Sequence, residues 1–138
     1  MSEVRNAGVR YRFVRKLLNR EKDKDGLELL EDLLKNCSNY VSYVAGMESK
    51  IQLAKLENDT KKYIKLVETL DAGRKIVHNA LIGRLLALNR YLFRKYGKER
   101  FPAGGIFSLD PLRIKDRVAV GDWAGYLVQY LKSRLWPF

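Results

Sequence analysis

The amino-acid sequence predicts an all-α protein, an elongated bundle of four main helices with a Pro/Gly loop before the last helix. Three observations support this fold class. Apolar residues recur every three or four positions along most of the chain, the spacing that places side chains on one face of a helix. The chain contains three prolines, so helix breakers are few. Asp, Asn and Gly also stand where the helices would begin and end.

The length and composition of the chain limit its classes. Residues 1–138 fit one small domain, with 46% hydrophobic residues available for a core. No apolar run approaches the roughly 20 residues that span a bilayer, so we expect no transmembrane segment. Cys37 is the single cysteine, which excludes an internal disulfide and favours a cytoplasmic location.

The first helix is expected over residues 3–20, and the lysine-rich turn of residues 21–26 ends it. An arginine-rich and acid-poor start would also suit an organellar transit peptide. A structural helix is favoured because the apolar side chains are large and numerous enough to pack. These side chains are Tyr11, Phe13, Val14, Leu17 and Leu18.

The second helix is expected to begin at Asp25 as its N-cap, with Glu28 completing a capping box. An apolar row with a 3.5-residue period then indicates one seam of a left-handed bundle. Residues 39–44 would also suit a strand, but the row continues through them and predicts helix. The row consists of Leu27, Leu30, Leu34, Cys37, Val41, Val44, Glu48 and Ile51.

The third helix is expected over residues 59–96, between the start signal Asn58-Asp59-Thr60 and the stop signal Tyr96-Gly97. Such a helix would be about 57 Å long, more than the ~40 Å diameter of a compact domain, so the bundle should be elongated. One face carries the row Val67, Leu70, Arg74, Val77, Leu81, Leu85, Leu88 and Leu92. A second face carries the small residues Gly73, Ala80, Gly83 and Ala87, which we expect to face the last helix or a second copy at close range.

The last helix is expected to begin at Asp110-Pro111, after a loop that contains Pro102 and Gly104-Gly105. This loop is no phosphate-binding P-loop, because no Lys-Ser/Thr pair follows the glycines. Gly121-Asp122 indicates a break or kink in the helix. The expected core face is Leu112, Ala119, Trp123, Tyr126, Leu127 and Tyr130.

Few residues are candidates for chemistry. His78 is the single histidine, and Asp71 is two helical turns away, about 10 Å, too far to share a metal with it. We therefore favour a core-edge histidine that hydrogen-bonds a neighbouring helix. The sequence shows no catalytic triad, so we expect no enzymatic activity, no cofactor and no metal site.

Glu48 and Arg74 each interrupt an apolar row, and charges in such positions are seldom left unpaired. A hairpin that turns near Asn58 would bring the two side chains within reach of each other. We predict that they form a buried ion pair that fixes helix register. The alternative is that Arg74 lines a pocket for an anionic ligand.

The net charge of +11 is concentrated in two segments, residues 1–20 and 84–100, which carry +5 each. The predicted hairpin would bring both to one end of the bundle, where they could bind phosphates. Alternatively, Glu28, Glu31 and Asp32 neutralise them internally, while Asp23 and Asp25 lie in a solvated turn. The candidate polyanion-binding residues are Arg12, Arg15, Lys16, Arg20, Arg94, Lys95 and Lys98.

The stretches His78–Ile82, Leu88–Leu92 and Gly121–Ala124 resemble a family of small bacterial proteins, found mainly in Gram-positive bacteria, that is catalogued as a domain of unknown function. The resemblance covers about the C-terminal half of the chain. It implies a helical bacterial protein and brings no activity, cofactor or catalytic residue with it.

Two functions fit these observations. A self-associating interaction module, a homo-oligomer, is favoured by the row of small residues. A nucleic-acid-binding accessory protein is the alternative, favoured by the two basic clusters. Enzymes and proteins that bind membrane surfaces have less support.

Overall fold

A computed structural model describes residues 2–100 and 117–134, without the side chains of residues 2, 98–100, 117–120 and 123. The described residues form four helices and no strand, which confirms the predicted all-α fold. The predicted loop and the Asp110-Pro111 start signal lie outside this range. The helices are α1 (Ser2–Arg20), α2 (Lys24–Leu56), α3 (Thr60–Arg100) and α4 (Arg117–Arg134).

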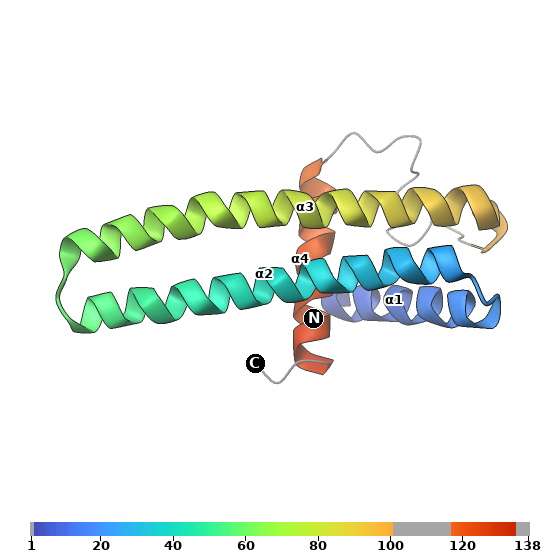
Figure 1. Cartoon of the computed structure of the whole chain (residues 1–138). Helices are drawn as coiled ribbons and strands as arrows, with labels where there is room; N and C mark the ends of the chain where they lie inside the picture. The colour runs from blue at the N-terminus through green and yellow to red at the C-terminus, as the bar shows by residue number, and fades with distance from the viewer. Residues whose placement is uncertain (1, 101–116, 135–138) are drawn as a thin grey trace.

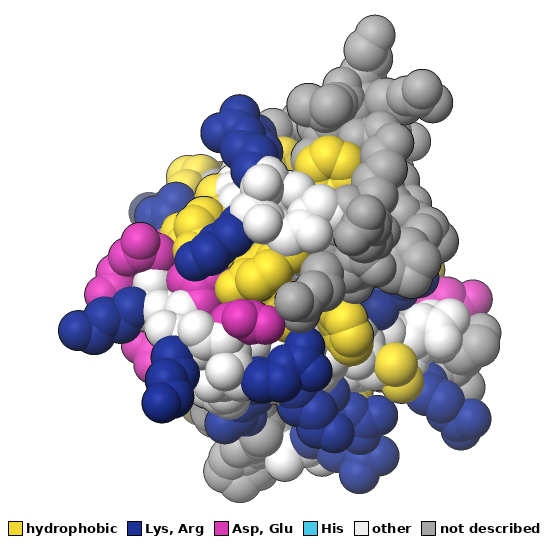
Figure 2. All heavy atoms as spheres, turned by 90° about the vertical axis from the view of Figure 1, so that its right-hand side faces the viewer, with side chains coloured by type: hydrophobic (Ala, Val, Ile, Leu, Met, Phe, Trp, Pro, Cys, Tyr) yellow, Lys and Arg dark blue, Asp and Glu magenta, His cyan; other side chains and the backbone are white. Residues whose placement is uncertain are grey.

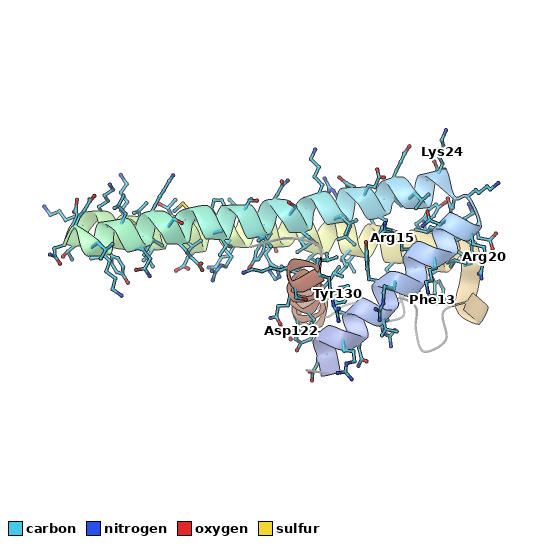
Figure 3. The ribbon with its side chains drawn as sticks, turned by 90° about the horizontal axis from the view of Figure 1, so that it is seen from below. Phe13, Arg15, Arg20, Lys24, Asp122 and Tyr130 are labelled. Atoms are coloured by element: carbon cyan, nitrogen blue, oxygen red, sulfur yellow. The ribbon has the colours of Figure 1, made fainter. Side chains whose placement is uncertain are left out.

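The molecule is elongated because α2 and α3 form one long antiparallel hairpin (Figure 1). Helix α4 crosses this hairpin, and α1 packs obliquely on the same side of it (Figure 3). Only the inner half of the hairpin is covered in this way. The outer half, residues 42–77, projects beyond α1 and α4, and we call it the arm.

One leucine-rich core joins all four helices and ends where the arm begins. Burying each leucine side chain contributes about 1.5–3 kcal/mol, so this core supplies most of the stability. The largest fully buried core residues are Val14, Leu17, Leu18, Leu33, Leu81, Leu85, Leu88, Leu92, Leu127 and Leu131.

The core faces of α1 and α4 differ in part from those expected. Phe13 is 47% exposed, so it lies outside the core. In α4 the buried residues differ from the expected row, and Leu127 is the residue that both share. The side chains of Leu112, Ala119 and Trp123, which the expected row contained, lie outside the described residues. The helix continues through Gly121-Asp122 without the expected break. The buried residues of α4 are Gly121, Ala124, Leu127, Val128 and Leu131.

The ends of α3 follow the sequence signals. The Asp59 carboxylate accepts a hydrogen bond from the Lys62 backbone N–H (3.1 Å), which caps the first turn. At the other end Gly97 has φ of 75°, a left-handed conformation that glycine adopts without strain. The regular helix therefore stops at the predicted Tyr96-Gly97 signal.

The predicted buried pair of Glu48 and Arg74 is wrong. Glu48 is exposed, because the seam of α2 steps from Val44 to Met47, which is 8% exposed, and leaves position 48 outside it. A straight helix has 3.6 residues per turn, so a strict 3.5-residue row drifts off the contact face. Arg74 is half-buried, and its Nε has no hydrogen-bond partner within the described part of the chain.

The row of small residues is only partly packed. At Gly73 a Cβ atom would overlap the Tyr43 hydroxyl, which donates a hydrogen bond to the Thr69 carbonyl oxygen (3.0 Å), so α2 and α3 meet closely here. At Gly83, by contrast, a Cβ atom would meet no described atom within 4 Å.

The rest of the row is open as well. Ala80 is half-buried and Ala87 is exposed, and in the described part of the chain α4 does not cover Gly83. Close contact of the whole row with another helix of the same chain is therefore wrong. Contact of this row with a second copy stays a prediction.

The two glycines give a matched test of this packing. Gly83→Ala should raise the free energy of unfolding by roughly 0.5–1 kcal/mol, since alanine favours a helix and meets free space. Gly73→Ala should lower it by about 1 kcal/mol, because Tyr43 must move and lose its hydrogen bond. Urea denaturation of both variants measures the difference. Equal effects at the two positions would contradict the close contact at Gly73.

Candidate functional site

A buried carboxylate, Asp23, lies at the end of the molecule where α1, α2 and α3 meet. It is 4% exposed and caps α2, accepting a hydrogen bond from the Gly26 N–H at 3.0 Å. Its two oxygens also accept hydrogen bonds from the hydroxyls of Tyr91 and Tyr96, each at 2.6 Å. The Lys95 ammonium lies 3.1 Å from Oδ2. One side chain thus joins the α1–α2 turn to the end of α3.

The hydrogen bonds around Asp23 keep it ionised. Burial alone would raise the pKa of Asp23, but the two tyrosine hydroxyls, the Gly26 N–H and Lys95 outweigh it and hold the pKa far below its ordinary value. Burial and the adjacent carboxylate raise the pKa of Tyr96 to about 12. The pKa of Lys95 is raised as well, chiefly by its hydrogen bond to Asp23. At neutral pH the cluster is a carboxylate that accepts bonds from neutral phenols and one cation.

Two sequence expectations at this turn are corrected. The N-cap of α2 is Asp23 rather than Asp25, and Asp23 is buried rather than solvated. The nearest sequence neighbours are lysines, whereas the partners that bury Asp23 come from α3, about seventy residues away. Gly26 permits the approach, because a Cβ there would lie 3.1 Å from the carboxylate and would overlap Leu18. In the sequence, the spacing Asp23-x-x-Gly26 was the one signal that Asp23 caps α2.

The basic residues of α3 at this end are partly neutralised. Lys95 pairs with Asp23, and Arg84 pairs with Asp32 at 2.6 Å. Arg94 is exposed and, with Arg90, Tyr91 and Lys95, lines a shallow groove of about 400 Å³. The Lys98 side chain lies outside the described residues.

The basic residues of α1 line a different groove, of about 300 Å³, between α1 and α4. The Arg12 guanidinium lies 5.9 Å from the centre of the Tyr130 ring, and Arg15 extends into the angle between the two helices (Figure 3). Arg20 is exposed and lies beyond the groove near the turn. The residues lining this groove are Tyr11, Arg12, Arg15, Lys16, Asn19 and Tyr130.

The two basic clusters therefore reach the same end of the molecule without forming one surface. Figure 2 shows this end, with Lys and Arg side chains gathered toward the α1 side and Asp and Glu side chains beside them. Of the expected acidic residues, Asp32 pairs with Arg84, whereas Glu28 and Glu31 are exposed. Arg84 and Lys95, the two cations in these ion pairs, both belong to α3.

His78 lies at the edge of the core, as expected. Its Nε2 is 3.4 Å from the Gly121 carbonyl oxygen of α4, and its ring centroid is 6.1 Å from that of Tyr40. It borders an open groove of about 550 Å³ between α3 and α4, together with Asp122 and Tyr126. Among the residues described, no group of three or more metal-ligating side chains occurs.

The arm carries the most exposed large apolar side chains. Leu56 is 79% exposed and Ile76 is 71% exposed, with Leu53 and Ile64 each about half exposed at 52% and 50%. Leu53 and Leu56 line a groove of about 790 Å³ along α2, which also includes Ala45 and Glu48. The apolar rows read from the sequence do not contain Leu53, Leu56 or Ile64, so this surface was not predicted.

The chain belongs to the family described as "Protein of unknown function (DUF3232)", whose pattern it matches over residues 3–134. The match extends well beyond the C-terminal half in which the sequence resemblance was found. The comparison with curated proteins finds no match. Among the described residues, no helix combines the length and apolar content required to cross a membrane.

Replacing Asp23 tests its position at the centre of this end. Asp23→Ala removes the cap of α2 and leaves two tyrosine hydroxyls without their acceptor, so it should lower the free energy of unfolding by about 2–4 kcal/mol. The ion pair adds little to this cost, because the Lys95 side chain is 49% exposed. Asp25→Ala, at an exposed position in the same turn, should change stability by about 0.5 kcal/mol or less. Similar losses in the two variants would contradict this assignment.

The raised pKa of Tyr96 predicts loss of stability in alkali. An unfolded chain ionises this tyrosine near its ordinary pKa of 10.0, whereas the folded protein keeps it neutral to about 12. The free energy of unfolding should therefore be fully retained below about pH 10 and fall as the pH rises toward 12.

Denaturation with urea at a series of pH values measures this slope. Tyr96→Phe should reduce the slope, whereas Tyr63→Phe, a change in the arm, should preserve it. If the free energy of unfolding falls with pH as steeply in Tyr96→Phe as in the wild type, the titrating group is not Tyr96.

Proposed function

We propose that this protein is a self-associating assembly module, in which the arms of two copies pack together. The observation that carries the proposal is the arm, a two-helix projection that neither α1 nor α4 covers and that exposes large apolar side chains. We propose further that it is a non-catalytic cytoplasmic protein of a Gram-positive bacterium, as the single cysteine and the family resemblance suggest.

The exposed apolar residues are distributed unevenly. Of the six exposed large hydrophobic residues in the described chain, Leu53, Leu56, Ile64 and Ile76 belong to the arm. Apolar side chains grouped on one projection mark an interaction surface, whereas isolated ones are ordinary. Two antiparallel helices have no third layer of their own, so a second hairpin would complete a four-helix bundle.

The charges of the arm favour a second copy as the occupant. Residues 42–77 contain seven lysines and arginines and five acidic residues, so the arm holds little of the net charge of +11. Two identical arms can therefore approach without strong repulsion, and their mixed charges can pair across a twofold axis. The basic ends of the two copies would lie far from the contact.

Nucleic-acid binding, the alternative, has weaker support. It required the cations of α1 and α3 to act together, but Lys95 and Arg84 are paired with carboxylates. The cations of α1 line a separate groove rather than a continuous track. A duplex-binding surface would need a row of free cations along the phosphates.

Light scattering at several protein concentrations tests the proposal. The wild-type protein should approach twice the chain mass of 16.0 kDa. The double variant Leu53→Lys/Leu56→Lys should remain monomeric at the same concentrations, because burying two ammonium groups at the contact is costly.

The matched control is Val9→Lys/Phe13→Lys, which adds the same charges at side chains of α1 that are 49% and 47% exposed. This control should keep the wild-type mass, and circular dichroism should show both variants helical. A monomeric wild type, or a control that dissociates as readily as the arm variant, would contradict association through the arm.

A further inference from the structure

We propose that the groove between α1 and α4 binds the phosphate group of a small phosphomonoester. This binding site is independent of self-association, because the groove lies on the opposite part of the molecule from the arm (Figure 3).

Three cations of one helix line the groove. Arg15 and Lys16 follow Arg12 by three and four residues, one helical turn further along α1, so both lie beside Arg12 on the same side of the helix. None of the three has an ion-pair partner within residues 2–100 and 117–134, in contrast to Lys95 and Arg84. Their charge is therefore available to a ligand.

The Tyr11 hydroxyl gives the groove a buried donor. Tyr11 is 3% exposed, and its hydroxyl oxygen has no hydrogen-bond partner in the described structure. A buried hydroxyl without a partner is costly, and native proteins seldom retain one. Tyr11 also lines the groove, and its hydroxyl is closed to water there, so a small movement of the side chain on binding would let an anionic oxygen accept the hydrogen bond that the hydroxyl lacks.

The tyrosine rings define the remainder of the site. The rings of Tyr11 and Tyr130 are tilted by 56° with centroids 6.2 Å apart, and Arg12 lies over the Tyr130 ring. This stacking holds a guanidinium in place beside the groove, where its N–H groups can donate to phosphate oxygens. The aromatic walls would contact the organic part of the ligand.

The size of the groove favours a small ligand. A volume of about 300 Å³ admits one phosphate with a compact substituent, at the lower limit for small-molecule sites. A nucleic-acid backbone presents its phosphates along a line, whereas these cations converge on one hollow. We therefore assign the site to a phosphomonoester rather than to a polynucleotide.

Calorimetric titration of the full-length protein tests the assignment, with phenyl phosphate and inorganic phosphate as separate probes at constant ionic strength. Phenyl phosphate should bind with saturation at one site per chain. If inorganic phosphate binds equally well, the site takes free phosphate and the proposed organic part is overturned. Failure of both probes to saturate would overturn the site itself.

Two variants distinguish a specific binding site in the groove from a general attraction of anions to the basic protein. Arg15→Gln should weaken phenyl phosphate about tenfold through the loss of charge-assisted hydrogen bonds, whereas Arg20→Gln, an exposed cation outside the groove, should leave affinity unchanged. Equal losses in the two variants would contradict the proposal.

Tyr11→Phe gives a second readout that does not depend on charge. Without ligand this variant should be at least as stable as the wild type, because it removes an unpartnered buried hydroxyl. Its affinity for phenyl phosphate should nevertheless fall severalfold. Unchanged affinity would show that the hydroxyl does not face the ligand. Binding of a short DNA duplex that weakens equally in Arg15→Gln and Arg20→Gln, with no phenyl phosphate binding, would favour a polynucleotide surface instead.

Discussion

The buried carboxylate of Asp23 fixes the arrangement at one end of the molecule. A charge removed from water must be fully hydrogen-bonded, and Asp23 obtains its partners from its own turn and from Tyr91, Lys95 and Tyr96 of α3. The start of α2 is thereby held against the end of α3, which sets the register of the hairpin. The same turn connects α1 to α2. It therefore determines where α1 meets α4 and forms the groove lined by Arg12, Arg15 and Lys16.

The distribution of apolar surface divides the molecule into two functional parts. Outside the arm, all four helices contribute to one core, and Val9 and Phe13 are the large apolar side chains that the described residues leave exposed there. The arm is built from the same two helices but lacks the covering layer, so Leu56 and Ile76 remain largely in solvent. A cooperative core that supports a projecting hairpin suits a protein whose outer part completes its packing with another chain.

Much of the fold could be predicted from the sequence, because leucine rows and end signals act locally. The rows through Leu30 and Leu81, and the stop at Gly97, were of this kind. Contacts between distant segments could not be predicted. The partners of Asp23 are about seventy residues away. The burial of Met47 in place of Glu48 depends on how α2 and α3 twist around each other, which the sequence rows do not give. The candidate site was found in part, since Arg12, Arg15 and Lys16 were named, whereas the buried Tyr11 hydroxyl depends on how α4 crosses α1.

Hydrogen exchange at increasing protein concentration tests the central claim most directly. If two copies pack through their arms, backbone amides of residues 42–77 should exchange more slowly as concentration rises, since association suppresses local opening. Amides of the inner core, such as those of residues 81–92, should change little in comparison. Exchange in the arm that is independent of concentration, or protection that appears on α1 instead, would contradict the account.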